Sequence, residues 1–458
     1  MPWDAIDRDI GFFISANPPM ALALLENPPM ALNQSDKSVD LTILMPCLNE
    51  AETLALCIAK AKKGLEGAGV TGEILIADNG STDGSIEIAE SLGARVERVR
   101  EKGYGNALRG GIRAAKGRWI LMGDSDDSYD FSAIRGFVRK LEEGNDLVMG
   151  CRLPSGGGTI IPGAMPWKNR WIGNPALSTI GRLFFQTPIH DFHCGMRGFS
   201  AEGYRRMKLK TTGMEFASEM VVNSTLNGLK VAEVPITLHP DGRSRPPHLK
   251  PWRDGWRHLR FMLLYSPDWL FMLPGLALLT AGMLLFLMLL VGPINIDRVT
   301  LSTGTMAVAG MMTLLGYQIL AQGFYAKVFA VAEGLLPSQP RFNRLFRAWN
   351  LERGIALGLA LGIAGTSVIG WAVWLWARKN FGTIDPQENL SRLIVGTTLI
   401  VLGAQTIFSS FHLSLLGLKT TSRTPPDPSQ TQPDSHQNEP SGSASRPGAV
   451  LPEGRLSA

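Results

Sequence analysis

The chain has 458 residues, of which 45% are hydrophobic and 19% are charged, and its formal net charge is +5. That length exceeds one ordinary domain, and the mild positive charge comes without any nucleic-acid-binding motif, so we expect no DNA or RNA partner. Charge is also unevenly spread, because much of the stretch after Trp269 is almost free of it. This split excludes a uniformly water-exposed protein and indicates a membrane segment.

Residues 1–38 are predicted to form a flexible arm. They lack the basic start and the clean apolar core of a secretory signal peptide. They contain the repeat NPPMAL, beginning at Asn17 and again at Asn27, and its paired prolines prevent a continuous helix.

From residue 39 the chain alternates apolar runs typical of strands with segments of helical spacing. The predicted strands are VDLTILM, GEILIAD, ARVERVR and RWILM, at residues 39–45, 72–78, 94–100 and 118–122. Strands joined by helices indicate a parallel α/β sheet, in which ligands bind beyond the carboxyl ends of the strands. The polar segments PCLNE, DNGSTDGS, EKGYG and GDSDDS lie at these ends and are therefore expected to line one crevice.

Carboxylates are crowded in the segment GDSDDSYDF, which contains Asp124, Asp126, Asp127 and Asp130. The spacing of Asp124 and Asp126 lets two carboxylates approach one hard divalent cation, which can in turn bridge two phosphates. The alternative is a turn followed by a helix N-cap, since Asp and Ser favour helix starts. The position directly behind a strand, beside the other polar ends, favours the metal site.

The other polar ends offer groups for a nucleotide. Asp78 can accept a hydrogen bond from a base or a ribose hydroxyl, and Asn49 and Glu50 offer similar acceptors. Gly103 and Gly105 allow a close backbone approach ahead of a helix N-terminus, which suits an anion.

Four apolar runs follow, at residues 269–292, 303–332, 354–377 and 393–418. Each has at least the ~20 residues that a helix needs to cross a bilayer. The loop between the second and third runs carries Arg341, Arg344, Arg347 and Arg353, so the positive-inside rule places it and both termini in the cytoplasm. Residues 419–458 are rich in Pro, Ser, Gln and Asp and are expected to be disordered.

Two segments ahead of the spans mix tryptophans with basic residues, at 162–186 and 248–269. This composition suits the headgroup zone of a membrane, although an ordinary amphipathic helix packed on the core is the alternative. His190, His193 and Cys194 are spaced too tightly for one tetrahedral zinc site, so we expect the histidines in the wall of an acceptor pocket. The four cysteines form no CxxC pair and are expected to be free thiols.

The segments MPCLNE, ADNGSTDGS, GYGNAL, GDSDDS, GCR and DFHCGMRGF, in that order, resemble family 2 glycosyltransferases. Within that family the chain is most similar to polyprenyl-phosphate sugar synthases of the dolichol-phosphate mannose or glucose type, over residues 41–259. The resemblance implies a GT-A fold, an α/β Rossmann-like mixed sheet with helices on both faces. The expected organisation is the arm, a cytoplasmic GT-A domain at 39–245, juxtamembrane amphipathic helices at 246–268, four transmembrane helices at 269–418 and the tail.

The resemblance also implies residue roles. Pro46, Asn49, Glu50 and Asp78 would hold the nucleoside, and Asp124 and Asp126 would bind the diphosphate through Mg²⁺ or Mn²⁺. Arg152 would meet the acceptor phosphate, Asp191 would lie near the sugar, and Glu219 would lie on a helix below the sugar pocket. Arg197 follows a glycine as the family pattern expects and would be a substrate-binding residue. Arg243, Ser244 and Arg245 resemble, imperfectly, a juxtamembrane stretch that closes over the donor diphosphate. Asp126, Asp191 and Arg152 are the expected catalytic residues.

The expected activity is the inverting transfer of a hexose from a nucleotide-diphosphate sugar, of the UDP-glucose or GDP-mannose type, to a polyprenyl phosphate. The enzyme would be integral to the cytoplasmic membrane, with its catalytic domain in the cytoplasm, and could form a homo-oligomer. One alternative is a processive polysaccharide synthase, but the segment WRDGWRHLRF lacks the glutamine of the Gln-x-x-Arg-Trp motif. The other is a non-catalytic membrane scaffold, against which the intact acids and arginines argue.

Overall fold

The structure is a computed structural model that describes residues 39–245, 251–337, 350–383 and 386–416. The predicted arm at 1–38 and the predicted tail at 419–458 lie outside these residues. So do Arg341, Arg344 and Arg347 of the loop from which the positive-inside rule orients the membrane spans.

One seven-stranded mixed sheet forms the centre of the first domain, with the strand order β3-β2-β1-β4-β7-β5-β8. Strand β7 is antiparallel to both of its neighbours, whereas the other neighbouring pairs are parallel. The mixed sheet implied by the resemblance is thus confirmed. The strands are β1 (Leu41–Cys47), β2 (Gly72–Asp78), β3 (Arg95–Arg98), β4 (Trp119–Met122), β5 (Leu147–Cys151), β7 (Arg197–Ser200) and β8 (Val231–Pro235).

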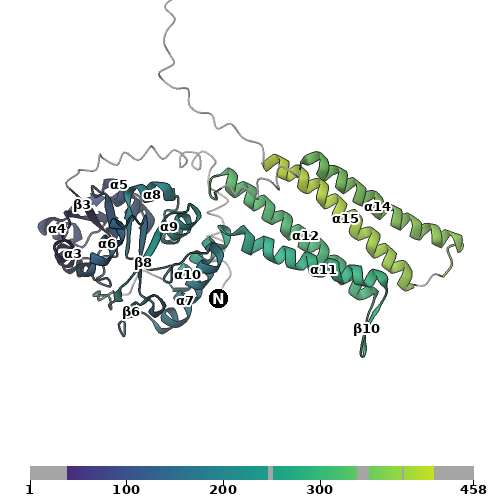
Figure 1. Ribbon diagram of the computed structural model, residues 1–458, viewed down its shortest axis with the longest axis horizontal. Helices are drawn as coiled ribbons and strands as arrows, with labels where there is room; N and C mark the ends of the chain where they lie inside the picture. Colours follow the sequence, from purple (N-terminus) through teal and green to yellow (C-terminus); the bar gives the residue numbers. More distant parts are fainter. Residues whose placement is uncertain (1–38, 246–250, 338–349, 384–385, 417–458) are drawn as a thin grey trace, which may run out of the picture. The chain divides into compact units, whose positions relative to one another are not determined.

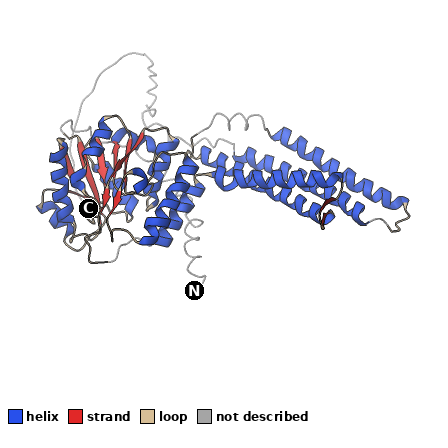
Figure 2. Cartoon of the chain, turned by 60° about the horizontal axis from the view of Figure 1, so that its bottom comes forward, coloured by secondary structure: helices blue, strands red, loops and turns tan. Residues whose placement is uncertain are grey.

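Helices lie on both faces of this sheet (Figure 2), so its central strands are buried along most of their length. Strand β1 is an example, since Leu41, Ile43, Leu44 and Met45 are all fully buried although they alternate between faces. The helices are α3 (Leu54–Ala68), α4 (Ser85–Ser91), α5 (Tyr104–Ala114), α6 (Arg135–Glu142), α7 (Asn174–Phe185), α8 (Ala201–Met207), α9 (Glu215–Leu226) and α10 (Pro251–Leu264). Shorter elements are η1 (Phe131–Ala133), η2 (Pro154–Gly156), η3 (Asn169–Gly173) and the strand pair β6 (Thr159–Ile160) and β9 (Thr237–Leu238).

The polar segments that follow the first four strands are hydrogen-bonded to one another, as the α/β pattern predicts. Asn49 Oδ1 accepts from the backbone N–H of Thr82 at 2.8 Å, which joins the ends of β1 and β2. Ser125 Oγ, after β4, donates to the carbonyl of Pro46 at 2.8 Å. The carboxyl edge of the sheet therefore gathers the candidate site residues.

Helices α7, α9 and α10 contact one another, and α7 and α10 lie within the two segments that the sequence predicts to be interfacial. Trp252 and Trp256 on α10 are well exposed, as are Trp167 and Trp171 just ahead of α7. Exposed tryptophans are costly in water but are favoured in the headgroup zone of a membrane. Their exposure is consistent with the predicted interfacial position.

Among the described residues, four helical segments are long and apolar enough to cross a membrane, as predicted (Figure 1). Helix α12 contacts both α11 and α15, and α15 contacts α14. A hairpin of β10 (Ile294–Ile296) and β11 (Val299–Leu301) joins α11 to α12. The spanning elements are η4 (Asp268–Met272), α11 (Leu273–Val291), α12 (Thr303–Ala332), α14 (Leu351–Arg378) and α15 (Pro386–Leu416).

Small residues let these helices approach closely, which is the usual basis of packing in lipid. Gly316 on α12 faces the backbone of α11, where an added Cβ would lie 2.3 Å from the nitrogen of Leu279. By contrast, a Cβ added at Gly370 on α14 meets no atom within 4 Å.

We therefore expect Gly316→Ile to destabilise the membrane part by about 1–3 kcal/mol, because the backbone of α11 must move away. Thermal unfolding of the detergent-solubilised protein measures the effect. Gly370→Ile is the matched control and should unfold close to the wild-type temperature. Equal stability of the two variants would contradict close packing of α11 on α12.

Candidate active site

The four aspartates of the crowded segment have different partners. Asp127 pairs with Lys60 at 2.6 Å, and Asp130 accepts from the backbone N–H of Ser132 at 2.9 Å, capping η1. The turn-and-cap explanation therefore accounts for Asp130, and an ion pair accounts for Asp127. One oxygen of Asp126 also takes part in a turn, through Ser128. Asp124 and Asp126 remain at the carboxyl edge.

Asp124 lies in an environment that disfavours its charge. Burial, followed by the negative charge of Asp126, raises the pKa of the Asp124 carboxyl to about 6. The hydroxyl of Tyr104, at the start of α5, donates to Asp124 Oδ1 at 3.1 Å and stabilises the carboxylate. Two neighbouring acids in this situation are suited to share a cation.

Both carboxylate oxygens of Asp126 accept hydrogen bonds within the protein. Its Oδ1 accepts from the backbone N–H of Ser128 at 3.1 Å and from the hydroxyl of Ser128 at 2.6 Å. Its Oδ2 accepts from Arg243 at 2.9 Å. The residue that the sequence places in the juxtamembrane stretch is thus in direct contact with a candidate metal ligand.

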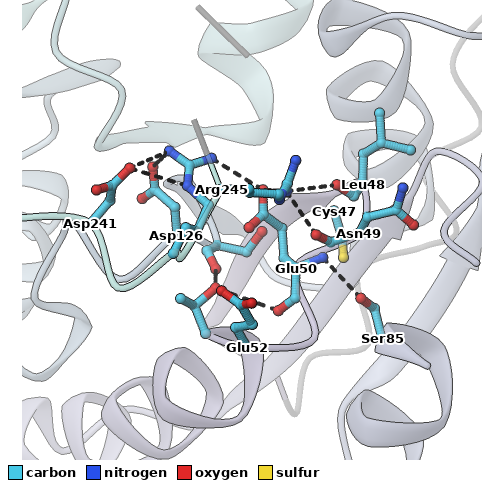
Figure 3. A network of polar contacts seen from close by, with 12 residues as sticks. Cys47, Leu48, Asn49, Glu50, Glu52, Ser85, Asp126, Asp241 and Arg245 are labelled. Atoms are coloured by element: carbon cyan, nitrogen blue, oxygen red, sulfur yellow. Dashed lines mark hydrogen bonds and ion pairs between the residues drawn. The ribbon is translucent and has the colours of Figure 1, made fainter. Parts of the chain in front are cut away.

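The segment 241–245, which we name the strap, lies against the ends of β1 and β4 (Figure 3). Besides Asp126, Arg243 contacts Glu50 at 3.3 Å, and Arg245 contacts Glu50 at 2.8 Å. Ser244 is fixed by Glu52, which accepts from its N–H at 2.7 Å and from its hydroxyl at 2.6 Å. The structure thereby brings together Glu50, Asp126 and the strap.

Glu50 is 7% exposed, and burial raises the pKa of its carboxyl although both arginines favour the charged form. Its Oε1 forms ion pairs with Arg243 and Arg245, whereas its buried Oε2 has no hydrogen-bond partner among the described residues. An unsatisfied buried carboxylate oxygen is costly. It is an acceptor available to a ligand hydroxyl or N–H.

Asp78 and Pro46, which are also predicted to hold the nucleoside, form hydrogen bonds with neighbouring loops at the sheet edge. Asp78 is buried and accepts from the backbone N–H groups of Gly80 at 2.9 Å and Ser81 at 3.1 Å. Pro46 accepts from Ser125 through its carbonyl. Gly103 has φ 129°, and its N–H donates to the side chain of Asn79, so it begins α5 in a conformation that favours glycine.

Arg152, at the end of β5, forms a bidentate ion pair with Asp191. Its Nε and NH2 groups donate at 2.7 and 2.9 Å, and its backbone N–H donates to the same carboxylate at 3.0 Å. Burial alone would lower the pKa of the guanidinium, but the charge of Asp191 outweighs this and raises it well above the ordinary value. Asp191 is completely buried, so its carboxylate fixes the direction of the Arg152 side chain.

The loop from Asp191 to Gly195 connects this ion pair to the aspartates. Gly195 lies so close to them that an added Cβ would be 2.8 Å from Asp124 Oδ2 and 2.9 Å from the hydroxyl of Tyr129. Its N–H donates to Tyr129 at 2.8 Å. A side chain at this position would force Asp124 or Tyr129 to move.

Arg197 and Glu219 are both completely buried, and their polar groups bond within the protein. Arg197 donates to the backbone carbonyls of Cys194, Phe192 and Ala217. Glu219 accepts from the N–H groups of Lys210 and Thr211 at 2.8–3.0 Å, which fixes the loop ahead of α9. Gly105 packs against that loop, since an added Cβ would lie 2.7 Å from the carbonyl carbon of Thr212.

His190 and His193 each contact a neighbouring side chain. His190 Nδ1 contacts Glu233 at 2.7 Å, and the ring of His193 packs against that of His258 with 4.7 Å between centroids. All four cysteines are free and buried, as expected. Burial raises the pKa of the Cys194 thiol to about 12.

Within the described ranges there is no group of three or more His, Cys, Asp or Glu side chains placed to hold a metal ion. Asp124 and Asp126 nevertheless fit a hard divalent cation that completes its shell with phosphate oxygens, because both offer carboxylate oxygens. The position of the Arg243 guanidinium on Asp126 indicates that this carboxylate attracts positive charge. The residues present therefore fit Mg²⁺ or Mn²⁺.

Several site residues were not predicted from the sequence. Glu233 on β8 accepts from the N–H groups of His190 at 2.7 Å and Asp191 at 3.1 Å, and so positions the partner of Arg152. Tyr104, Glu52 and Asp241 were also missed, and Asp241 accepts from Arg243 at 2.9 Å. Tyr104 and Glu52 stand inside or beside the motifs GYGNAL and MPCLNE, whereas nothing local distinguishes Glu233.

We expect Asp124→Asn to stabilise the protein without ligands at pH 7.5, by about 1 kcal/mol or about 2–4 °C in Tm. The raised pKa means that the folded state resists the charged carboxylate, a penalty that is fully present above pH 6. Asparagine keeps the bond from Tyr104 without the charge. Thermal unfolding between pH 5 and 8 should show a gain that shrinks as the pH falls through 6, and a gain independent of pH would contradict the assignment.

We expect Asp191→Asn to destabilise the protein by about 3–5 kcal/mol, because it leaves a buried guanidinium without its counter-charge. Asp126→Asn is the comparison, since Arg243 keeps Glu50 and Asp241 as partners there. Thermal unfolding of both variants in detergent gives the ranking. If Asp191→Asn were the more stable of the two, Asp191 would not be the residue that holds Arg152.

Comparison with known proteins identifies the family to which the chain belongs. Residues 42–207 match the glycosyl transferase family 2, and residues 324–417 match the glycosyltransferase family 2 C-terminal transmembrane region. A low-salt glycan biosynthesis hexosyltransferase, Agl6 of Haloferax volcanii, is 34% identical over 385 residues, which cover 84% of this chain and 90% of the relative. A dolichyl-phosphate hexose transferase of the same organism is 29% identical over 198 residues, covering 43% of this chain and 82% of the relative.

Among solved structures, glucosyl-3-phosphoglycerate synthase from Mycobacterium tuberculosis is 20% identical, with a TM-score of 0.38 and coverage of 51% of this chain and 80% of that one. A likeness at this level does not bear on the activity. The match to Agl6 runs through both the catalytic and the membrane parts. The chain therefore belongs to the family 2 glycosyltransferases and is a hexosyltransferase-like enzyme with a GT-A domain and a transmembrane region.

Proposed function

We propose that this enzyme transfers a hexose from a nucleotide-diphosphate sugar to a polyprenyl phosphate at the cytoplasmic face of the membrane. The observation that carries the proposal is the loop from Asp191 to Gly195. One of its ends holds the arginine Arg152, and the other abuts Asp124. This arrangement supports an acceptor phosphate and a donor diphosphate bound beside each other.

The donor would lie at the ends of β1, β2 and β4. The unsatisfied Oε2 of Glu50 supports a hydrogen bond to the nucleoside, and Asp78 and Asn49 hold the loops on either side of it. A bound Mg²⁺ or Mn²⁺, held by Asp124 and Asp126, would offset the charge of the diphosphate leaving group. Arg243 and Arg245 would add positive charge from the strap.

The acceptor phosphate would meet Arg152. Among the described residues, Asp191 is the bonded partner of this guanidinium and takes Nε and NH2, so further N–H groups can bind a phosphate. A phosphomonoester has a second pKa near ~6 and is already a nucleophile at neutral pH, so no strong general base is needed. Arg152 would orient the attacking oxygen, and a single in-line displacement would invert the anomeric centre.

The membrane helices support a lipid acceptor, and one relative's name contains dolichyl phosphate. Exposed tryptophans on α10 support an interfacial position for the edge of the catalytic domain. The arginine-rich loop between α12 and α14 supports a cytoplasmic position for this domain. Arg197 and Glu219 would act from below the sugar by fixing loops, since both are buried.

The proposal is tested with radiolabelled UDP-glucose and GDP-mannose and a polyprenyl phosphate, followed by partition into organic solvent. Label in the organic phase that depends on the lipid phosphate is the expected result. Label in a polymer would instead indicate a processive synthase. An absence of transfer from any of a panel of nucleotide sugars would favour a non-catalytic scaffold.

We expect Asp126→Asn to lower the rate of transfer by at least about 10²–10³-fold while the protein reaches the membrane at normal levels. The variant removes a charge at the diphosphate without removing a buried partner of Arg152. Glu143→Gln, an exposed acid bonded to Lys140 on the surface, is the control and should keep the wild-type rate. Wild-type turnover by Asp126→Asn would refute a role for this carboxylate.

A further inference from the structure

We propose that Arg243 is an exchangeable counter-ion, which neutralises Asp126 while the donor site is empty and gives up this carboxylate when a divalent cation and diphosphate bind. The inference rests on the proposed function, because it assumes that Asp126 is a metal ligand during transfer. In this proposal Arg243 has two partners. It binds the Asp126 carboxylate before the donor binds, and it binds the departing diphosphate afterwards.

The geometry of Arg243 is that of a cation at the centre of acidic groups. Its guanidinium lies 2.9 Å from Asp126, 2.9 Å from Asp241 and 3.3 Å from Glu50. Its side chain is only 10% exposed, so these interactions are weakly screened by water. One guanidinium therefore neutralises these carboxylates in the way that a divalent cation would.

The oxygen that a metal ion needs is the one that Arg243 occupies. Asp126 Oδ1 is fixed within its own turn by the N–H and hydroxyl of Ser128. Asp126 Oδ2 is bonded to Arg243. A cation and the guanidinium cannot both hold Oδ2 closely, because like charges at that separation repel strongly in a partly buried site.

A diphosphate makes the exchange favourable. Its negative charges provide new partners for the displaced guanidinium, which forms strong charge-assisted bonds to phosphate oxygens. The strap can stay in place during the exchange, because Ser244 is anchored to Glu52 and Arg245 donates to the carbonyl of Asn49 at 2.7 Å. Metal without diphosphate must displace Arg243 with no such compensation, and is therefore expected to bind weakly.

Isothermal titration of the full-length protein in detergent with Mn²⁺ alone, in the absence of nucleotide, tests this exchange. We expect Arg243→Gln to bind Mn²⁺ at least about tenfold more tightly than the wild type, because a competing positive charge is removed from Asp126. Arg139→Gln is the control, since it also removes one arginine charge, but from an exposed side chain on α6 that pairs with Glu143. It should leave the Mn²⁺ affinity within about twofold of the wild type, which corresponds to about 0.4 kcal/mol.

Arg243→Lys is a second variant, which tests the proposal if Arg243→Gln does not fold. A lysine keeps the charge but not the planar fork, so it should give a gain smaller than that of Arg243→Gln. Mn²⁺ affinities of both Arg243 variants equal to that of the wild type would overturn the proposal. Because the readout is metal binding, a failure of sugar transfer in the wild type would refute the proposed function and leave this result standing.

Discussion

Negative charge buried at the carboxyl edge of the sheet is the constraint on which the site depends. Glu50, Asp124 and Asp126 come together because the ends of β1 and β4 are neighbours in a mixed sheet. Such carboxylates are tolerated only with counter-charge nearby. In this chain the counter-charge comes from Arg243 and Arg245. The strap therefore stabilises the edge of the sheet by its charge.

The second charged cluster consists of Arg152, its partner Asp191 and the further acid Glu233. Asp191 and Glu233 form a line behind Arg152, in which Glu233 fixes the loop and Asp191 fixes the guanidinium. Neither acid has to touch a substrate for the arginine to be placed accurately. The same loop ends at Gly195 against Asp124. Both ends of this short segment therefore contact candidate site residues, Arg152 at one end and Asp124 at the other.

The membrane part and the catalytic part obey different packing rules. The sheet is stabilised by apolar strands buried on both faces, as in β1. The spans cannot gain from leaving water, so they pack through small residues such as Gly316. The chain therefore joins a domain built on a sheet buried between helices to a set of helices that are apolar enough to cross a membrane.

The sequence by itself determined the alternation of strands and helices, the polar segments behind the first four strands and the four apolar spans. These features are local, because periodicity and turn residues act over a few positions. Only the tertiary structure decided that the short strand β7 inserts antiparallel between β4 and β5, that Asp191 holds Arg152, and that Arg243 sits on Asp126. Those contacts join residues far apart in the chain, and electrostatic partners at such separations leave no pattern in the neighbouring residues. Glu233 is an example, since nothing beside it in β8 indicates the loop that it holds.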